Sequence, residues 1–167
     1  SYISYFLTPA TVCLAIPLYK QLELLKKNLT AVATAITAGV IGSVVSVYVM
    51  SMVFKLEHVH YVSLLPKSIT TAIGMGVSEE AGGIVTMTIV SIIITGILGN
   101  IVADGWFKFI GIKEPIAKGL ALGTSAHAIG TAKALELGEV EGAMSSLSIA
   151  VSGLMTVVIV PVMSGLI

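Results

Sequence analysis

The chain has 167 residues, of which 56% are hydrophobic and 11% are charged, and its mean hydropathy is +1.02. A soluble domain carries about 25% charged residues, so this composition indicates a protein embedded in lipid. The formal net charge is zero and all basic residues are lysines, which excludes nucleic acid as a broad electrostatic partner. The single cysteine, Cys13, allows neither an internal disulfide nor a cysteine-based metal site.

Long apolar runs predict the membrane crossings. A spanning helix needs about 20 apolar residues, and three runs meet this requirement: 29–54, 84–103 and 143–167. Residues 3–19 form a fourth candidate, which Pro9 and Pro17 make short or kinked, and which lacks the basic start of a signal peptide. Since no initiator methionine is present, we expect residues 1–167 to be a single membrane domain, and a fragment that lacks N-terminal helices.

The connections between these runs carry the charged residues. Residues 20–27, KQLELLKK, hold three lysines against one glutamate, which indicates a cytoplasmic loop. In the simplest threading of the chain, Lys55, Lys108 and Lys113 fall on the opposite side, so the sequence determines the orientation only weakly. Residues 104–113 mix aromatic residues with lysines, which fits either an aromatic belt at the headgroup level or a plain connecting loop.

Two segments, 64–83 and 115–142, are too polar for ordinary spanning helices and too apolar for water. Within them, ITTAIGMGVSEE (69–80) and SAHAIGTAKALE (125–136) align without a gap and share Ala-Ile-Gly. One crossing between the two copies would give them opposite orientations. We therefore predict an all-α polytopic membrane helical bundle, with half-repeats of about 29–103 and 104–167, in which two inverted-repeat broken (discontinuous or re-entrant) helices meet near the midplane.

The polar residues of these two segments are the candidate site. Free N–H groups of broken helices and side-chain hydroxyls suit an anionic substrate, and five glycines permit breaks or close backbone approach: Gly74, Gly76, Gly119, Gly123 and Gly130. The candidate substrate-binding residues are Lys67, Ser68, Thr70, Thr71, Thr124, Ser125, His127, Thr131 and Lys133. Each has an alternative role: the hydroxyls can bond their own backbone, the lysines can extend to the membrane surface, and His127 can join two helices instead of handling substrate or protons.

Other polar residues fit ordinary structural roles. Six hydroxyl residues along the spanning runs are expected to bond helix backbone: Thr30, Thr34, Ser43, Ser46, Thr95 and Ser152. His58, His60 and Glu57 lack a further metal ligand nearby, so a solvated loop is the favoured interpretation. Because neither a nucleophile-base-acid set nor a nucleotide motif is present, we expect no enzymatic activity, no cofactor and no metal.

One block of sequence resembles a known family. The run PIAKGLALGTSAHAIGTAKALELGEVEGAMSSL (115–147), with LLPKSITTAI upstream, resembles the LrgB/CidB family of holin/antiholin-like membrane proteins, whose plastid relative is a glycolate/glycerate transporter. The resemblance implies either of two functions. One is regulation of murein hydrolase activity and cell lysis, with a small LrgA/CidA-type membrane protein as partner. The other is transport of small carboxylates.

We favour the transport interpretation from the residues. A secondary transporter of small monocarboxylates, of the glycolate, glycerate, pyruvate or lactate type and coupled to protons, needs hydroxyls, helix N-termini and a cation at the midplane, which both polar segments offer. Lysis regulation is the alternative function. The expected location is the bacterial cell membrane, with multiple crossings. Small-residue runs such as AVATAITAGVIGSVVS suit tight helix packing in the lipid bilayer or a homodimer face.

Overall fold

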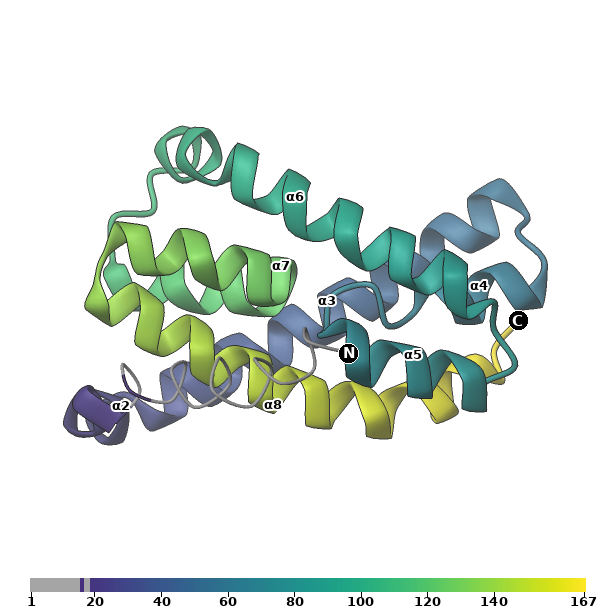
Figure 1. Ribbon diagram of the computed structural model, residues 1–167, viewed down its shortest axis with the longest axis horizontal. Coiled ribbons are helices and arrows are strands. Elements are labelled where there is room, and N and C mark those ends of the chain that lie inside the picture. Colours follow the sequence, from purple (N-terminus) through teal and green to yellow (C-terminus); the bar gives the residue numbers. More distant parts are fainter. Residues whose placement is uncertain (1–15, 17–18) are drawn as a thin grey trace, which may run out of the picture.

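The structure is a computed structural model that describes residue 16 and residues 19–167. The candidate span at 3–19 and Cys13 lie outside the described residues, apart from residues 16 and 19. The described part of the chain is helical, with seven helices and no strand, as predicted for an all-α bundle (Figure 1).

Three helices are long and apolar enough to cross a membrane: α3 (Leu29–Phe54), α6 (Val85–Phe109) and α8 (Glu139–Ser164). The short helix α2 (Leu22–Lys27) precedes them. Large apolar side chains cover their outer faces, for example Leu154 and Val158 of α8, because these faces meet lipid rather than water. The prediction of a multi-pass membrane protein is therefore confirmed.

The boundaries of two spans differ from the prediction. Helix α6 continues through residues 104–109, which we expected in a connecting stretch. It ends before Gly111, because the φ of +73° at this glycine is incompatible with an α-helix. Helix α8 begins at Glu139 instead of residue 143, directly after the extended Gly138. Acidic residues in its first turn, Glu139 and Glu141, suit the positive end of the helix dipole.

The first polar segment forms a helical hairpin, the "first hairpin", made of α4 (His58–Leu64), residues 65–70 and α5 (Thr71–Glu80). Thr88 of α6 bonds both arms, because its Oγ1 lies 2.8 Å from the Ser63 carbonyl oxygen and 2.7 Å from Ser78 Oγ. Pro66 lies in the link, where its missing N–H costs no helical hydrogen bond. With ten residues, α5 is about 15 Å long, half the thickness of a bilayer core.

The second polar segment forms the "second hairpin". Helix α7 (Pro115–Leu137) is broken at His127, whose φ and ψ are 43° and −133°. Ser145 of α8 shows that the chain reverses there: its Oγ lies 2.7 Å from Thr131 Oγ1 in the second arm, and its backbone lies directly against Gly123 in the first arm. Four of the five glycines, all except Gly76, provide the predicted close approach, but the break falls on His127 instead of a glycine.

The two hairpins enter the bundle from opposite ends, and their tips face each other near its centre (Figure 1). The end of the bundle where α3 begins also holds the start of α8, since Lys20 Nζ lies 3.7 Å from Glu139 Oε1. At the other end, His58 Nδ1 lies 2.6 Å from the Ile167 carbonyl oxygen. Because the first hairpin does not cross, α6 returns to the first end, and the threading that placed Lys108 and Lys113 opposite residues 20–27 is wrong.

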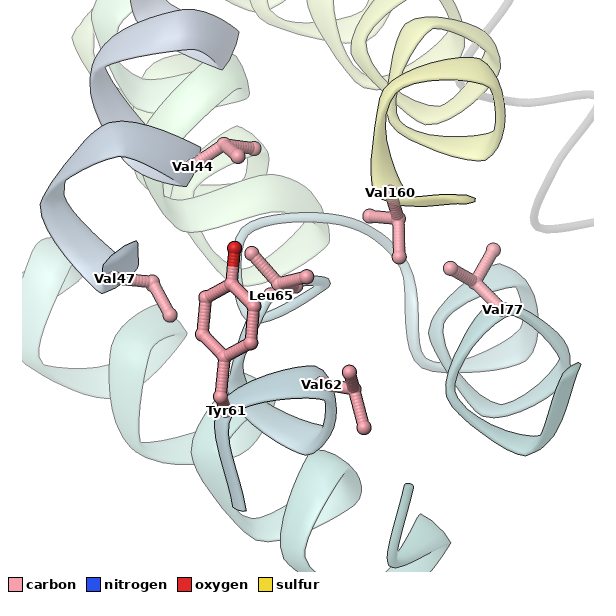
Figure 2. Packing of buried hydrophobic residues seen from close by; sticks show 7 residues of the cluster. All are labelled: Val44, Val47, Tyr61, Val62, Leu65, Val77 and Val160. Atoms are coloured by element: carbon pink, nitrogen blue, oxygen red, sulfur yellow. The ribbon is translucent and has the colours of Figure 1, made fainter. Parts of the chain in front are cut away.

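A buried apolar cluster holds the first hairpin in place. Figure 2 shows this cluster: Val44, Val47, Tyr61, Val62, Leu65, Val77 and Val160. Its members come from α3, both arms and the tip of the hairpin, and α8, so the tip is packed on several sides. The Tyr61 hydroxyl also donates to the Met163 carbonyl oxygen at 2.9 Å. This packing fixes the position of Lys67, which directly follows Pro66.

Candidate functional site

A cavity of about 820 Å³ lies between α3, α6, the first arm of α7 and the tip of the first hairpin. Hydroxyls of Thr95, Thr124 and Ser125 line it. Trp106, Phe107 and small or aliphatic residues form most of the remaining wall. Among the residues that the structure describes, Lys67 is the single charged residue in this lining. The cavity is therefore a largely apolar cleft, open beside the exposed Val102 and Trp106, with one positive charge and a few hydroxyls.

Lys67 is held at the tip of the first hairpin by two serines. Its Nζ donates to Ser68 Oγ at 3.1 Å and to Ser43 Oγ at 3.3 Å, and Ser43 donates to Ser68 at 2.9 Å. No carboxylate in the described part of the chain lies within 4.0 Å of this ammonium. A cation at membrane depth without a counter-ion is costly, so an anion that enters the cavity gains a favourable partner.

Hydroxyls from four parts of the fold surround a small void beside the cavity. The void has a volume of about 10 Å³, close to the smallest that holds one water molecule. Its polar lining consists of Ser43, Ser68, Thr124, Ser152 and Thr156. Thr124 and Thr156 each donate their only hydroxyl proton to a backbone carbonyl, at 2.7 Å in both cases. Each of these two hydroxyls therefore keeps only acceptor capacity for a further partner.

His127 is buried where the second hairpin meets α6. Its Nε2 lies 2.9 Å from the Ile92 carbonyl oxygen, to which a protonated Nε2 donates. Gly96 makes room for the ring, because a Cβ at that position would lie 2.8 Å from His127 Cε1. The ring therefore joins two helices in this conformation and is not part of the cavity lining. Its role in substrate or proton handling stays a prediction.

The other candidate residues lie apart from the cavity. Thr131 Oγ1 bonds Ser145 Oγ and the His127 carbonyl oxygen. Thr70 directly precedes α5 without capping it through its side chain, and Thr71 is the first residue of that helix. Lys133 Nζ lies 2.8 Å from Asp104 Oδ2, and this hydrogen bond raises the pKa of the Lys133 ammonium above its ordinary value. Of the nine candidates, Lys67, Thr124 and Ser125 line the cavity, and Ser68 bonds Lys67 beside it.

Comparison with known proteins decides the family. The sequence matches the LrgB-like family over residues 1–166. The chain belongs to the LrgB family. It is 45% identical over 159 residues to the "Antiholin-like protein LrgB" of Bacillus mycoides (strain KBAB4), which covers 95% of this chain and 69% of that protein. The proteins of the same name from Bacillus cereus (strain B4264) and Bacillus anthracis (strain CDC 684 / NRRL 3495) are 43% identical with the same coverage. No solved structure matches this LrgB family member.

In this LrgB family member, two residues that we assigned to ordinary helix packing belong to the site. Ser43 bonds Ser68 and Lys67, and Thr95 lines the cavity. Ser152 does bond its own helix, through the Ser148 carbonyl, but it also borders the small void. Thr34 and Ser46 bond helix backbone as expected. The sequence does indicate close helix contacts at Thr95 and Ser152, because each of them precedes a glycine that allows another helix to approach closely.

Proposed function

We propose that this LrgB family member is a carrier of small monocarboxylates. The observation that supports this function is the cavity bordered by the tip of the first hairpin and the second hairpin, in which Lys67 is the one charged residue among those described. One ammonium balances one carboxylate, so a monoanion would bind without leaving an unpaired charge in the apolar cavity. Thr124 and Ser125 each donate their hydroxyl proton to a backbone carbonyl, so they can accept from the hydroxyl group of glycolate, glycerate or lactate. The Thr95 hydroxyl can donate to a carboxylate or to the keto group of pyruvate.

We also propose that the two hairpins are copies of one inverted repeat. Their opposite points of entry support this, as does the position of the shared Ala-Ile-Gly, which lies near the start of the second arm in each hairpin. The spanning helix after each hairpin contacts the other hairpin through a glycine: Gly96 of α6 meets His127, and Gly153 of α8 meets Ile73. In carriers of this kind, movement of one repeat against the other opens the site to each side in turn.

Proton coupling is part of the same proposal. A proton that travels with the substrate would make the net charge moved across the membrane zero, and His127 is the buried titratable residue at the tip of the second hairpin. While Nε2 donates to the Ile92 carbonyl, the proton would be taken at Nδ1, and the bond to Ile92 can stay in place. Because the ring is not part of the cavity lining, the coupling requires a movement that brings Nδ1 within reach of the substrate or of water.

Uptake by reconstituted protein tests the carrier function. We expect saturable uptake of labelled glycolate, glycerate, pyruvate or lactate into proteoliposomes, stimulated by an inward proton gradient. Lys67→Gln should reduce uptake at least about tenfold, the worth of a lost charged hydrogen bond, and Thr124→Val, which removes a neutral acceptor, should reduce it about two- to tenfold. Lys55→Gln is the matched control, because Lys55 lies outside the cavity at the end of α3, and it should transport normally.

Two results would contradict this function. The first is the absence of uptake for all four acids by folded wild-type protein. The second is uptake that Lys67→Gln and Lys55→Gln leave equally unchanged, which would move the site away from the cavity. If His127→Ala abolishes only the stimulation by the proton gradient, His127 carries the proton; unchanged stimulation would mean that the proton travels with the acid.

A second candidate function is antiholin-like regulation of murein hydrolase activity and cell lysis. The names of the Bacillus relatives support this function more directly than they support transport. In this case we propose that the protein acts with a small LrgA/CidA-type membrane protein. The test is autolysis of cells that express the chain with and without that partner: an effect on lysis that Lys67→Gln preserves would favour regulation without transport. Unselective dye leakage from vesicles would favour a pore.

A further inference from the structure

A second cleft, the "basic cleft", lies at the end of the bundle where α6 turns into α7. It has a volume of about 500 Å³. Its lining residues are Asp104, Phe107, Lys108, Gly111, Ile112, Lys113, Lys118 and Leu137. Three lysines from the last turn of α6, the connecting turn and the first arm of α7 thus converge on one hollow. Gly111, with φ of +73°, makes the turn that brings Lys108 and Lys113 to the same side.

The charge of this cleft is unbalanced. Asp104 is the one acidic residue in its described lining, and Asp104 is already paired with Lys133 at 2.8 Å. Within the described chain, Lys108, Lys113 and Lys118 have no carboxylate within 4.0 Å. Glu114, next to Lys113 in sequence, is exposed and is not part of the lining. Three neighbouring ammonium groups without acidic partners favour an anion with several acceptor oxygens, such as a phosphate group.

The position of the cleft indicates where this phosphate comes from. The cleft lies at the end of a helix that is long and apolar enough to cross the membrane. The same end of this helix carries the stacked rings of Trp106 and Phe109, which are not part of the cleft lining and whose centroids are 5.8 Å apart. These rings are 57% and 81% exposed, as expected for an aromatic belt at the headgroup level. A headgroup phosphate reaches this depth while its acyl chains lie along the apolar face of α6, whereas a soluble phosphate gains nothing from that face.

We propose that the basic cleft binds the phosphate headgroup of an anionic membrane lipid. Basic pockets between membrane helices hold anionic headgroups in this way. The proposal is independent of the transported substrate, because the cleft is separate from the cavity that contains Lys67. The two spaces share one wall residue, the buried Phe107. A lipid that bridges Lys108 and Lys118 therefore joins the end of α6 to the second hairpin and braces the wall of the cavity.

Thermal unfolding with defined lipids tests this site. The protein is purified in a neutral detergent, and phosphatidylglycerol or phosphatidylcholine is added. We expect phosphatidylglycerol to raise the unfolding temperature of the wild-type protein more than phosphatidylcholine does. A triple variant, Lys108→Gln, Lys113→Gln and Lys118→Gln, should bind phosphatidylglycerol with an affinity roughly tenfold or more lower, since each lysine near an anionic headgroup contributes to binding.

The matched control removes the same charge from the same end of the bundle. It carries Lys20→Gln, Lys26→Gln and Lys27→Gln, and it should keep the preference for phosphatidylglycerol. An equal loss in both triple variants would overturn the proposal, because general surface charge would then explain the effect. An equal rise with inorganic phosphate would also overturn it, in favour of a soluble anion. All these lysines are wholly or partly exposed, so the variants should fold.

Discussion

At the scale of single residues, His127 combines two features with opposite effects on stability. Its φ of 43° lies in a region that L-residues rarely adopt, which costs about 1–3 kcal/mol, while its ring bonds the Ile92 carbonyl. Both His127→Gly and His127→Ala remove the ring, but only glycine relieves the backbone. We therefore expect the free energy of unfolding of His127→Gly to exceed that of His127→Ala by about 1–3 kcal/mol, measured by denaturant unfolding in detergent.

The same exchange at a helical position provides the control for this prediction. Ala132 is exposed in the second arm of α7, where Ala132→Gly should lower the free energy of unfolding by about 1 kcal/mol. Relative to alanine, glycine is thus expected to stabilise the protein at position 127 and to destabilise it at position 132. Equal stability of the two His127 variants would show that the tip relaxes to an ordinary conformation once the ring is gone.

The sequence predicts the kinds of residue in the site better than their contacts. Lys67, Thr124 and Ser125 were recognisable as polar residues beside predicted breaks in an apolar chain, and they line the cavity. Ser43 was not, because its local surroundings are those of any spanning helix, and the glycine after Thr95 indicates a close helix approach but not that Thr95 lines a cavity. Their neighbours across the bundle, which no local pattern contains, give them a place in the site.

At the scale of elements, the packing of α7 on α8 depends on glycines that let two backbones touch. A Cβ at Gly123 would lie 2.4 Å from the Ser145 carbonyl oxygen, a backbone atom that cannot move without displacing α8. We expect Gly123→Ala to lower the free energy of unfolding by about 1–3 kcal/mol, as overpacking does in other tightly packed interiors. Thermal or denaturant unfolding of the purified protein measures this change.

Gly42 of α3 is the control for this packing prediction, since a Cβ there meets nothing within 4 Å. Gly42→Ala should be neutral or should stabilise the helix by up to about 1 kcal/mol, because alanine is the better helix former. If Gly123→Ala and Gly42→Ala change the free energy of unfolding equally, helix propensity would explain both changes, and the close contact of α7 with α8 would not contribute.

Elements were predictable to different degrees. The three spans follow from hydropathy, which is local, so their existence was predicted and their ends shifted by a few residues. The hairpins were harder, because a polar segment of about 20 residues fits a crossing as well as a reversal. Contacts with a neighbouring helix decide between them: Thr88 bonds both arms of the first hairpin, and Ser145 contacts both arms of the second.

At the scale of the whole molecule, the reversal of the first hairpin redistributes the charges between the two ends. Six lysines lie at the end where α3 begins: Lys20, Lys26, Lys27, Lys108, Lys113 and Lys118. Lys55 lies at the opposite end, with the exposed acids Glu57, Glu79 and Glu80. Lysine-rich ends of membrane proteins face the cytoplasm. We therefore predict that α3 and α8 begin, and α6 ends, on the cytoplasmic side.

Labelling of single cysteines in intact cells measures this orientation. In a Cys13→Ser background, we expect a membrane-impermeant maleimide to label Glu57→Cys and Glu80→Cys from outside, and to label Lys20→Cys and Lys113→Cys only after the membrane is permeabilised. Position 113 is decisive, because a first hairpin that crossed the bilayer would place it on the same side as position 57. External labelling of Lys20→Cys and Lys113→Cys but not of Glu57→Cys would contradict the orientation. External labelling of Lys113→Cys together with Glu57→Cys would contradict the reversal, and the tips of the two hairpins would then not meet at the centre of the bundle.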